Sequence, residues 1–290
     1  MHSHTPHGLR VRMFVSMALL GVVYAIPVAA VLLIGVPWPV VAVLAVLTVT
    51  VQWFGTEWLA RQAAGARFVD ANQEPELHAV LDRLCALNDL PKPRVAVSLD
   101  SAPNAFTVGR SRRHTTVVVT SGLLRTLEPD ELTAVLAHEI AHIRHRDVAV
   151  MTLASSFAIA LAWIGRNTGR TFLYAPGELL EAGLIGVAVV VVGAFAALLG
   201  ALAQLPLRAL SRYRELAADH GAAVQLGQPA LLASALLKVH NPDVIPRTDL
   251  RVSRIPALGL VARRPARLSW LSTHPPLAKR VNRLEALLRR

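Results

Sequence analysis

The chain has 290 residues, of which 53% are hydrophobic and only 17% are charged, and its mean hydropathy is +0.45. Soluble proteins carry about 25% charged residues, so this composition excludes an ordinary soluble protein and indicates a membrane protein with a soluble part attached. The lone Cys85 excludes an intramolecular disulfide and a zinc site built from thiolates.

The net charge of +11 is distributed unevenly along the chain. Residues 61–147 contain 11 basic and 11 acidic side chains, whereas residues 208–290 contain 15 basic and 5 acidic ones. A basic segment that follows an apolar one is typical of the cytoplasmic side of a membrane, where anionic lipid head groups attract it. We therefore expect a lipid bilayer, and no nucleic acid, as the partner of this charge.

Two uncharged runs open the chain, at residues 13–34 and 36–54. Each can cross a bilayer core, which takes about 20 helical residues. Pro37-Trp38-Pro39 predicts a tight turn between them. Basic residues precede the first run and follow the second, and none lies in the turn. Because positive charge stays on the cytoplasmic side, we expect an uncleaved hairpin with both ends in the cytoplasm.

The next part of the chain has the pattern of a soluble α+β domain. Pro75 to Leu87 is predicted to form an amphipathic helix, and residues 94–99 and 115–120 are predicted to form strands, with a basic turn at residues 109–113. A further helix is expected from Glu128 to about Asp147, since a proline and acidic residues suit its first turn.

Two more apolar runs follow, and they complete the predicted domain organisation. Residues 148–164 are short and contain two serines, so whether they cross the membrane stays open, whereas residues 182–207 are a firmer span. The predicted domains are a transmembrane hairpin (1–60), a first soluble part (61–147), an apolar insertion (148–207) and a second soluble part with a basic tail (208–290).

The motif His138-Glu139-Ile140-Ala141-His142 lies on the helix expected to end near Asp147. Residues four apart on a helix share one face, so His138 and His142 can direct their imidazoles at one point. Two converging neutral imidazoles form half of a Zn²⁺ site, and Glu139 is placed to reach a metal-bound water. A catalytic zinc site still requires a third protein ligand and an open position.

Other histidines are weaker candidates for the third ligand. The position at which metzincins carry theirs is Val148, which excludes that class. His145 shares a helix face with His138, but it lies between two arginines and such a trio splays too widely around one ion. We interpret it as solvated or as a neighbour of a ligand. A cluster near the N-terminus lacks carboxylates and is interpreted as incidental: His2, His4 and His7.

An acidic pair in the segment at residues 211–219 is the better candidate. Glu215 and Asp219 are four residues apart and share a helix face. Glu215 can ligate a metal, while Asp219 is suited to hold a ligand imidazole through its far N–H group. In the alternative interpretation both carboxylates pair with arginines on the helix surface, and spacing alone leaves the two interpretations open.

Four motifs together resemble HtpX-type membrane zinc metalloproteases, gluzincins related to the CAAX prenyl protease. In chain order they are Asn104-Ala105-Phe106, His138-Glu139-Ile140-Ala141-His142, Ser211-Arg212-Tyr213-Arg214-Glu215-Leu216-Ala217-Ala218-Asp219 and Thr273-His274-Pro275-Pro276. The resemblance covers most of the chain, including both apolar regions, and four motifs in order are far more specific than any one of them.

The resemblance implies an α-helical membrane protein with an α+β zincin-like catalytic domain, mostly helical with a small β-sheet. It implies a membrane-bound endopeptidase, multi-pass in the inner (plasma) membrane with a cytoplasmic catalytic domain. It also implies a role in stress response and membrane protein quality control. The expected substrates are proteins or peptides, including membrane proteins, and no oligomeric state is predicted.

For the site, the resemblance implies one Zn²⁺ per chain on His138, His142 and Glu215, with Glu139 as the general base and Asp219 holding a ligand imidazole. His274 is implied to be a catalytic residue near the scissile carbonyl, and the alternative is a turn histidine before two prolines. Asn104, Ala105 and Phe106 are implied to line the substrate cleft, and the alternative is a plain turn into a strand.

Two other functions stay open. One is a catalytically silent membrane scaffold or regulator that keeps zinc for structure, which the intact Glu139 disfavours. The other is an intramembrane site-2-type metalloprotease, whose zinc helix is itself a span. The charged residues on both sides of residues 138–142 disfavour this second alternative.

Overall fold

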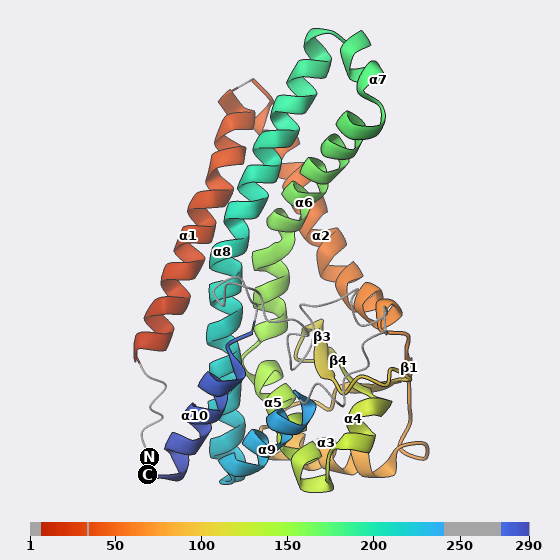
Figure 1. The fold of residues 1–290 in the computed structure, drawn as a ribbon, viewed down its shortest axis with the longest axis vertical. Coiled ribbons are helices and arrows are strands. Elements are labelled where there is room, and N and C mark those ends of the chain that lie inside the picture. The colour runs from red at the N-terminus through yellow and green to blue at the C-terminus, as the bar shows by residue number, and fades with distance from the viewer. Residues whose placement is uncertain (1–6, 34, 241–273, 290) are drawn as a thin grey trace. The chain divides into compact units, whose positions relative to one another are not determined.

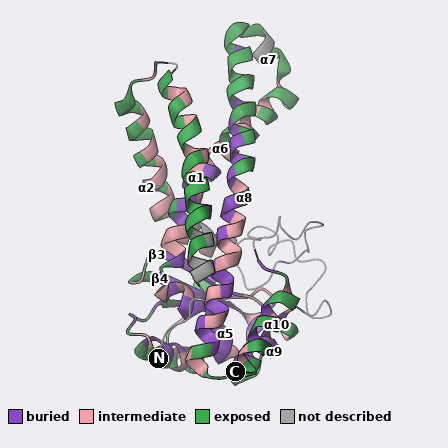
Figure 2. Cartoon of the chain, turned by 90° about the vertical axis from the view of Figure 1, so that its left-hand side faces the viewer, coloured by how far each residue is buried: buried purple, intermediate pink, exposed green. Residues whose placement is uncertain are grey.

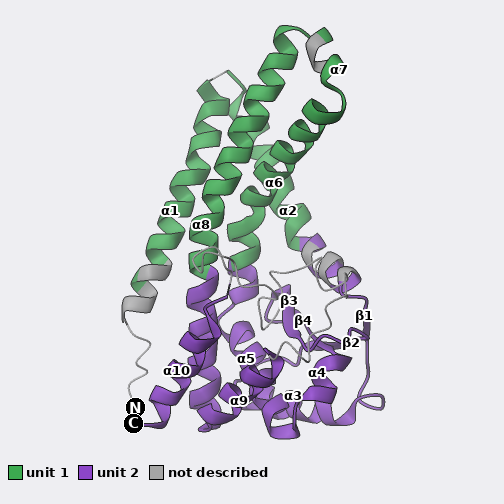
Figure 3. Cartoon of the chain, in the orientation of Figure 1, with its two compact units in different colours: residues 1–53, 151–210 green, residues 54–150, 211–290 purple. Residues whose placement is uncertain are grey.

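A computed structural model describes residues 7–33, 35–240 and 274–289, and its chain divides into two compact units. Unit 1 comprises residues 1–53 and 151–210, and unit 2 comprises residues 54–150 and 211–290. Figure 1 gives the order of the elements along the chain, and Figure 3 marks the two units. Each unit therefore combines two separate stretches of sequence.

The first unit draws on long apolar helices. Among the described residues, four helices are long and apolar enough to cross a membrane: α1 (His7–Leu33), α2 (Trp38–Ala63), α6 (Asp147–Tyr174) and α8 (Leu184–Leu226). The short α7 (Pro176–Glu181) follows α6. The first two are the predicted hairpin. Because α6 has 28 residues, the apolar run at 148–164 belongs to a helix of sufficient length to cross.

Unit 1 exposes many of its large apolar side chains, and small residues lie at its closest helix contacts. Figure 2 shows exposed positions along much of α1 and α8, and many of them are large hydrophobic residues. Between α6 and α8 the backbones approach closely. A Cβ added to Gly165 would lie 2.6 Å from the Cβ of Ala197, and one added to Gly193 would lie 2.3 Å from Thr168. Small residues at such crossings let membrane helices pack by van der Waals contact.

A small mixed sheet lies in unit 2. Within the described residues it has four strands in the order β1-β2-β4-β3. Their bounds are β1 (Ala66–Phe68), β2 (Arg94–Ser98), β3 (Ala105–Ser111) and β4 (His114–Thr120). β2 and β4 are parallel, whereas β1 with β2 and β3 with β4 are antiparallel. β3 is therefore an edge strand of this sheet.

The sequence patterns predict β2 and β4 but not β1 or β3. The turn expected over residues 109–113 is shorter, because β3 continues through Gly109 to Ser111. Residues 105–109 are all buried, so this strand lacks the alternation that marks a half-buried one. Gly109 has a φ of 153°, and an added Cβ there would lie 2.2 Å from the carbonyl oxygen of His114. Close approach of β4 thus explains a glycine inside a strand.

Helix α5 (Pro129–Arg144) lies at the centre of unit 2 and most of its residues are buried. Pro129 occupies its first turn, and Glu128 and Glu131 form a reciprocal capping box that fixes its start. The other helices of this unit are α3 (Pro75–Leu87), α4 (Ser121–Thr126), α9 (Pro229–Val239) and α10 (Leu277–Leu288). Only α3 and α5 among these are predicted by the sequence patterns.

The two faces of the sheet have different neighbours. Ala105 and Val117 belong to the main hydrophobic core, which also contains the buried residues of α5. Phe106 and Val108 belong to a smaller cluster on the other face. Because side chains alternate along a strand, Thr107 shares the face of Ala105 and points toward α5.

Candidate metal centre

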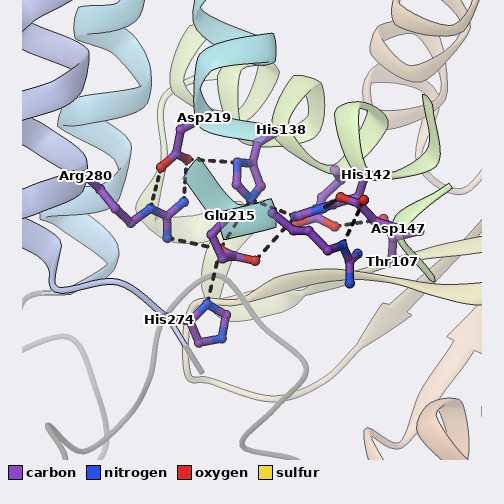
Figure 4. A network of polar contacts seen from close by, with 10 residues as sticks. Thr107, His138, His142, Asp147, Glu215, Asp219, His274 and Arg280 are labelled. Carbon is purple, nitrogen blue, oxygen red and sulfur yellow. Dashed lines mark hydrogen bonds and ion pairs between the residues drawn. The ribbon is translucent and has the colours of Figure 1, made fainter. Parts of the chain in front are cut away.

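Helices α5 and α8 bring the three predicted ligands together, as Figure 4 shows. One ligand atom from each of His138, His142 and Glu215 lies within 4.8 Å of the others. The two Nε2 atoms are 3.2 Å apart. Glu215 Oε2 is 3.8 Å from Nε2 of His138, and Glu215 Oε1 is 3.5 Å from Nε2 of His142. The i, i+4 spacing on α5 thus directs both rings at the carboxylate.

Each ring nitrogen that faces away from this point meets a carboxylate. His138 Nδ1 lies 3.0 Å from Asp219 Oδ1. His142 Nδ1 lies 2.7 Å from Asp147 Oδ2, a contact that the sequence analysis did not predict. A carboxylate beside Nδ1 keeps the proton there, so both Nε2 lone pairs point to the same place.

Asp147 is itself held by a charged neighbour. Its Oδ1 atom lies 2.8 Å from Nε of Arg214, an ion pair in which both side chains are buried. Burial by itself would lower the pKa of His142, but hydrogen bonds with Asp147 and Glu215 raise it to about 10. Groups that favour a proton on this ring also favour a divalent cation between the ring and Glu215.

The C-terminal part of the chain closes the other side of the site. His274 Nδ1 lies 3.2 Å from Glu215 Oε2, and Arg280 Nη1 lies 3.5 Å from the same oxygen. Arg280 also donates two hydrogen bonds to Asp219, from Nε at 2.8 Å and from Nη2 at 2.6 Å. Burial disfavours charge on Arg280, but the Asp219 carboxylate raises the pKa of this guanidinium above its ordinary value. α10 therefore fixes both acidic residues of α8.

Glu139 lies beside the cluster and contacts the sheet. Its Oε2 atom accepts a hydrogen bond from Thr107 Oγ1 at 2.8 Å, and both residues are buried. Of the segment predicted to line the substrate cleft, Ala105 is buried in the main core and Phe106 packs on the far face of the sheet. Asn104 is partly exposed, and its N–H donates to Thr120 Oγ1. Of these three residues, Asn104 is the one that is partly exposed.

Among the histidine side chains that the structure describes, His145 does not join the cluster. His145 is the C-cap of α5, and its Nε2 lies 3.5 Å from Arg144 Nη2. Burial lowers the pKa of His145, so it is a neutral neighbour of the site. His2 and His4 lie outside the described residues, and of His7 only the backbone is described.

The donor set fits a divalent metal ion such as Zn²⁺. Tetrahedral Zn²⁺ with bonds of about 2.0–2.2 Å keeps neighbouring ligand atoms roughly 3.3 Å apart. The two Nε2 atoms are 3.2 Å apart, and the Glu215 carboxylate approaches them to 3.5 Å through Oε1 and to 3.8 Å through Oε2. Two imidazoles and one carboxylate are also the donors that catalytic zinc sites use. Buried lone pairs that face one another are stabilised when a cation lies between them.

Three residues of this network were missed from sequence. Asp147 lies five residues after His142, and this short spacing was a signal that could have identified it. Arg280 contacts Asp219 across 61 positions, and Thr107 contacts Glu139 across 32. Neither separation corresponds to a period of helix or strand, so no local pattern points to these pairs.

Comparison with known proteins agrees with this geometry. A model of peptidase family M48 matches residues 71–288. The chain belongs to this family. It is 42% identical to protease HtpX homolog 1 of Streptomyces coelicolor over 284 aligned residues. This alignment covers 95% of this chain and 91% of that protein. It is 38% identical over 297 residues to the protease HtpX homolog of Moorella thermoacetica, covering 97% and 94%.

This M48 peptidase also has a solved structural relative. The crystal structure of S. mikatae Ste24p aligns with a TM-score of 0.54 and 19% identity, over 95% of this chain and 67% of that one. The likeness confirms the predicted fold class, a helical membrane protein with a small sheet. The family and its relatives confirm that the chain is a membrane-bound metallopeptidase of the HtpX type. Its cofactor is thus a metal ion, and its substrates are peptides or proteins.

Proposed function

We propose that this metallopeptidase is a zinc-dependent endopeptidase that holds one Zn²⁺ on His138, His142 and Glu215. The observation that carries the proposal is the convergence of two Nε2 atoms and one carboxylate at separations of 3.2–3.8 Å, with Glu139 alongside. When bound, Zn²⁺ supplies a Lewis acid that polarises a peptide carbonyl and makes a water molecule acidic.

The chain's own residues then handle protons and charge. Glu139 takes a proton from the attacking water and delivers it to the nitrogen of the leaving amine, as a general base and then a general acid. Asp219 holds the Nδ1 proton of His138 and so keeps the Nε2 lone pair directed at the metal position. His274, buried beside Glu215, donates to the developing oxyanion, a role that contributes about 2.7–4 kcal/mol in other hydrolases.

The edge of the sheet is the proposed substrate position. The backbone at Asn104 to Phe106 leads into β3, an edge strand of the described sheet, and Thr107 of the same strand contacts Glu139. An extended peptide can add to such an edge through main-chain hydrogen bonds. The buried side chains of Ala105 and Phe106 leave recognition to backbone groups and to Asn104.

The cellular role rests on composition and family. The four apolar helices and the membrane protease relatives support a multi-pass membrane protein. The excess of basic residues after position 208 supports a cytoplasmic catalytic domain, and we propose the plasma membrane as its location. Damaged or misfolded membrane proteins are the proposed substrates, in stress response and quality control. α5, the proposed zinc helix, is not among the spans found in the described residues, which disfavours the intramembrane alternative.

Two substitutions test the assignment in the detergent-solubilised protein. Glu139→Gln is expected to keep one zinc per chain while kcat on a model peptide falls at least about 100-fold, because the proton acceptor is lost. Glu215→Ala is expected to lose both zinc and cleavage. Glu285→Ala, on the exposed face of α10, is the matched control and should behave as wild type.

Zinc content by elemental analysis and cleavage by a quenched fluorescent peptide give the two readouts. Normal cleavage by Glu139→Gln would show that Glu139 is not the base. Wild-type protein that contains zinc but cleaves no peptide, including itself, would instead support the catalytically silent scaffold.

A further inference from the structure

Thr107 is a buried polar residue whose hydroxyl contacts the carboxylate of the proposed general base. Strand threonines commonly bond to backbone groups, as Thr120 does with the carbonyl of Ala102. Thr107 Oγ1 instead donates to Glu139 Oε2 at 2.8 Å, from β3 to α5, across 32 positions of sequence. Thr107 is 8% exposed and Glu139 is 3% exposed. Water therefore competes weakly for this bond.

This hydrogen bond fixes the rotation of the Glu139 carboxylate, which the side-chain rotamer leaves undefined. The terminal torsion of a glutamate has a broad distribution, so a carboxylate plane is not set by its own rotamer. Threonine, in contrast, is β-branched and stiff at χ1. A hydroxyl on a stiff side chain in a hydrogen-bonded strand can therefore define how the carboxylate of Glu139 is rotated. Hydrogen bonds to a charged acceptor are also stronger than neutral ones.

We propose that Thr107 is a positioning residue for the proton-transfer step of this peptidase: its hydroxyl holds Oε2 of Glu139 and directs Oε1 toward the reacting water and the leaving amine. The inference rests on the proposed role of Glu139 as the general base. In the described part of the chain the Thr107 hydroxyl contacts Glu139 and none of the three proposed metal ligands, so it acts through Glu139. Its loss therefore affects the reaction rate, and leaves substrate affinity and metal content unchanged.

The sheet contains a matched control for the same chemical change. Thr116, in the adjacent strand β4, is also buried, and its hydroxyl also donates to a carboxylate, Glu57 Oε1, at 2.8 Å. Thr116 pairs with Val108 in the β3–β4 register. Replacing either threonine by valine removes one hydroxyl from the same sheet, but only Thr107 contacts Glu139.

The test compares kcat and KM on a model peptide, together with zinc per chain, for wild type, Thr107→Val, Thr107→Ser and Thr116→Val. We expect Thr107→Val to lower kcat about tenfold, since the Glu139 carboxylate loses a charge-assisted hydrogen bond that fixes its rotation. KM should stay within about twofold of the wild-type value, because the variant keeps the contacts that bind the substrate before the reaction. The zinc content should stay at one per chain, because the three proposed ligands are unchanged. Thr107→Ser, which keeps the hydroxyl, should restore most of the rate, and Thr116→Val should match wild type.

Several results would overturn the inference. They are an unchanged kcat in Thr107→Val, a change confined to KM, a loss of rate proportional to lost zinc, and an equal loss in Thr116→Val. If Thr107→Val does not fold, Thr107→Ala removes the same hydroxyl without adding bulk and is assessed by the same criteria. Glu139→Gln separates the two proposals. An active Glu139→Gln removes the proposed function, whereas an inactive one beside a normal Thr107→Val removes only the role of Thr107.

Discussion

The two units of this peptidase differ in what they bury. In unit 1 the closest helix contacts are between small residues, such as Gly165 against Ala197, and many large apolar side chains face outward. In unit 2 the interior of the site is charged: the buried Arg280 lies within ion-pair distance of both Glu215 and Asp219, which are buried too. Shape thus organises the helix crossing in the first unit, whereas compensated charge organises the metal site in the second.

This difference determines how each unit responds to mutation. Removing one member of a buried charge network leaves its partners uncompensated, which costs far more than the loss of an exposed ion pair. Adding a methyl group to a close helix contact instead forces the backbones apart. Unit 2 is therefore expected to be sensitive to changes of charge, and unit 1 to changes of volume.

The largest effect is expected at Arg280. Arg280→Met should lower the free energy of unfolding by about 3–5 kcal/mol, because Asp219 and Glu215 lose their buried counter-charge. Zinc content should fall as well, since both carboxylates lose their fixed positions. Thermal unfolding in detergent and elemental analysis measure the two effects. Arg283→Met, on the exposed face of the same helix, is the control and should change stability by no more than about 0.5 kcal/mol. Equal effects at both positions would contradict a charge-organised interior.

A smaller effect is expected at Asp147, which the sequence analysis missed. Asp147→Asn should weaken zinc binding about 10–100-fold, because the imidazole of His142 loses the carboxylate that orients it. Competition with a chelator of known affinity measures this change. Asp130→Asn, an exposed carboxylate on α5, should leave the affinity unaltered. Wild-type affinity in Asp147→Asn would mean that the contact with His142 does not support the metal site.

In unit 1 a change of volume is expected to matter without affecting the metal. Gly165→Ala places a Cβ 2.6 Å from that of Ala197, and such overpacking costs about 1–3 kcal/mol. Gly169→Ala lies on the same helix with no atom within 4 Å of its added Cβ, so it should stabilise the protein by up to about 1 kcal/mol through helix propensity. Thermal unfolding of both variants, with zinc per folded chain, tests this contrast. A greater loss of stability in Gly169→Ala would refute the assigned contact.

The smallest effect concerns pH and the helix cap of unit 2. Burial opposes charge on Glu131, but hydrogen bonds from Lys238 and Ser234 lower its pKa below the ordinary value. A carboxylate whose pKa is lower in the folded state stabilises fully above its unfolded pKa. This contribution is lost as the pH falls through the folded pKa. In Glu131→Gln the free energy of unfolding should therefore fall less steeply than in the wild type as the pH is lowered from about 6 to about 3. The same pH dependence in the variant and the wild type would show that ionised Glu131 does not contribute to stability.

Much of this protein was determined by local features of its sequence. Apolar runs long enough to cross a bilayer predict the spans, and i, i+4 spacing predicts that His138 and His142 share a face, because both properties depend only on neighbouring residues. The order of four motifs identifies the family, which the comparisons confirm. The roles of the three ligands and of Glu139 stay a prediction until metal and cleavage are measured.

The tertiary structure alone decided the rest. β3 was missed because residues 105–109 are all buried, so the strand lacks a two-residue period. Arg280 and Thr107 reach their partners across 61 and 32 positions, and Phe106 packs on the face of the sheet opposite to that of Ala105. Such pairs depend on how helices and strands pack in space, which leaves no repeat along the chain. The sequence therefore specifies the metal-binding motif, while packing selects the charges and hydroxyl groups that orient it.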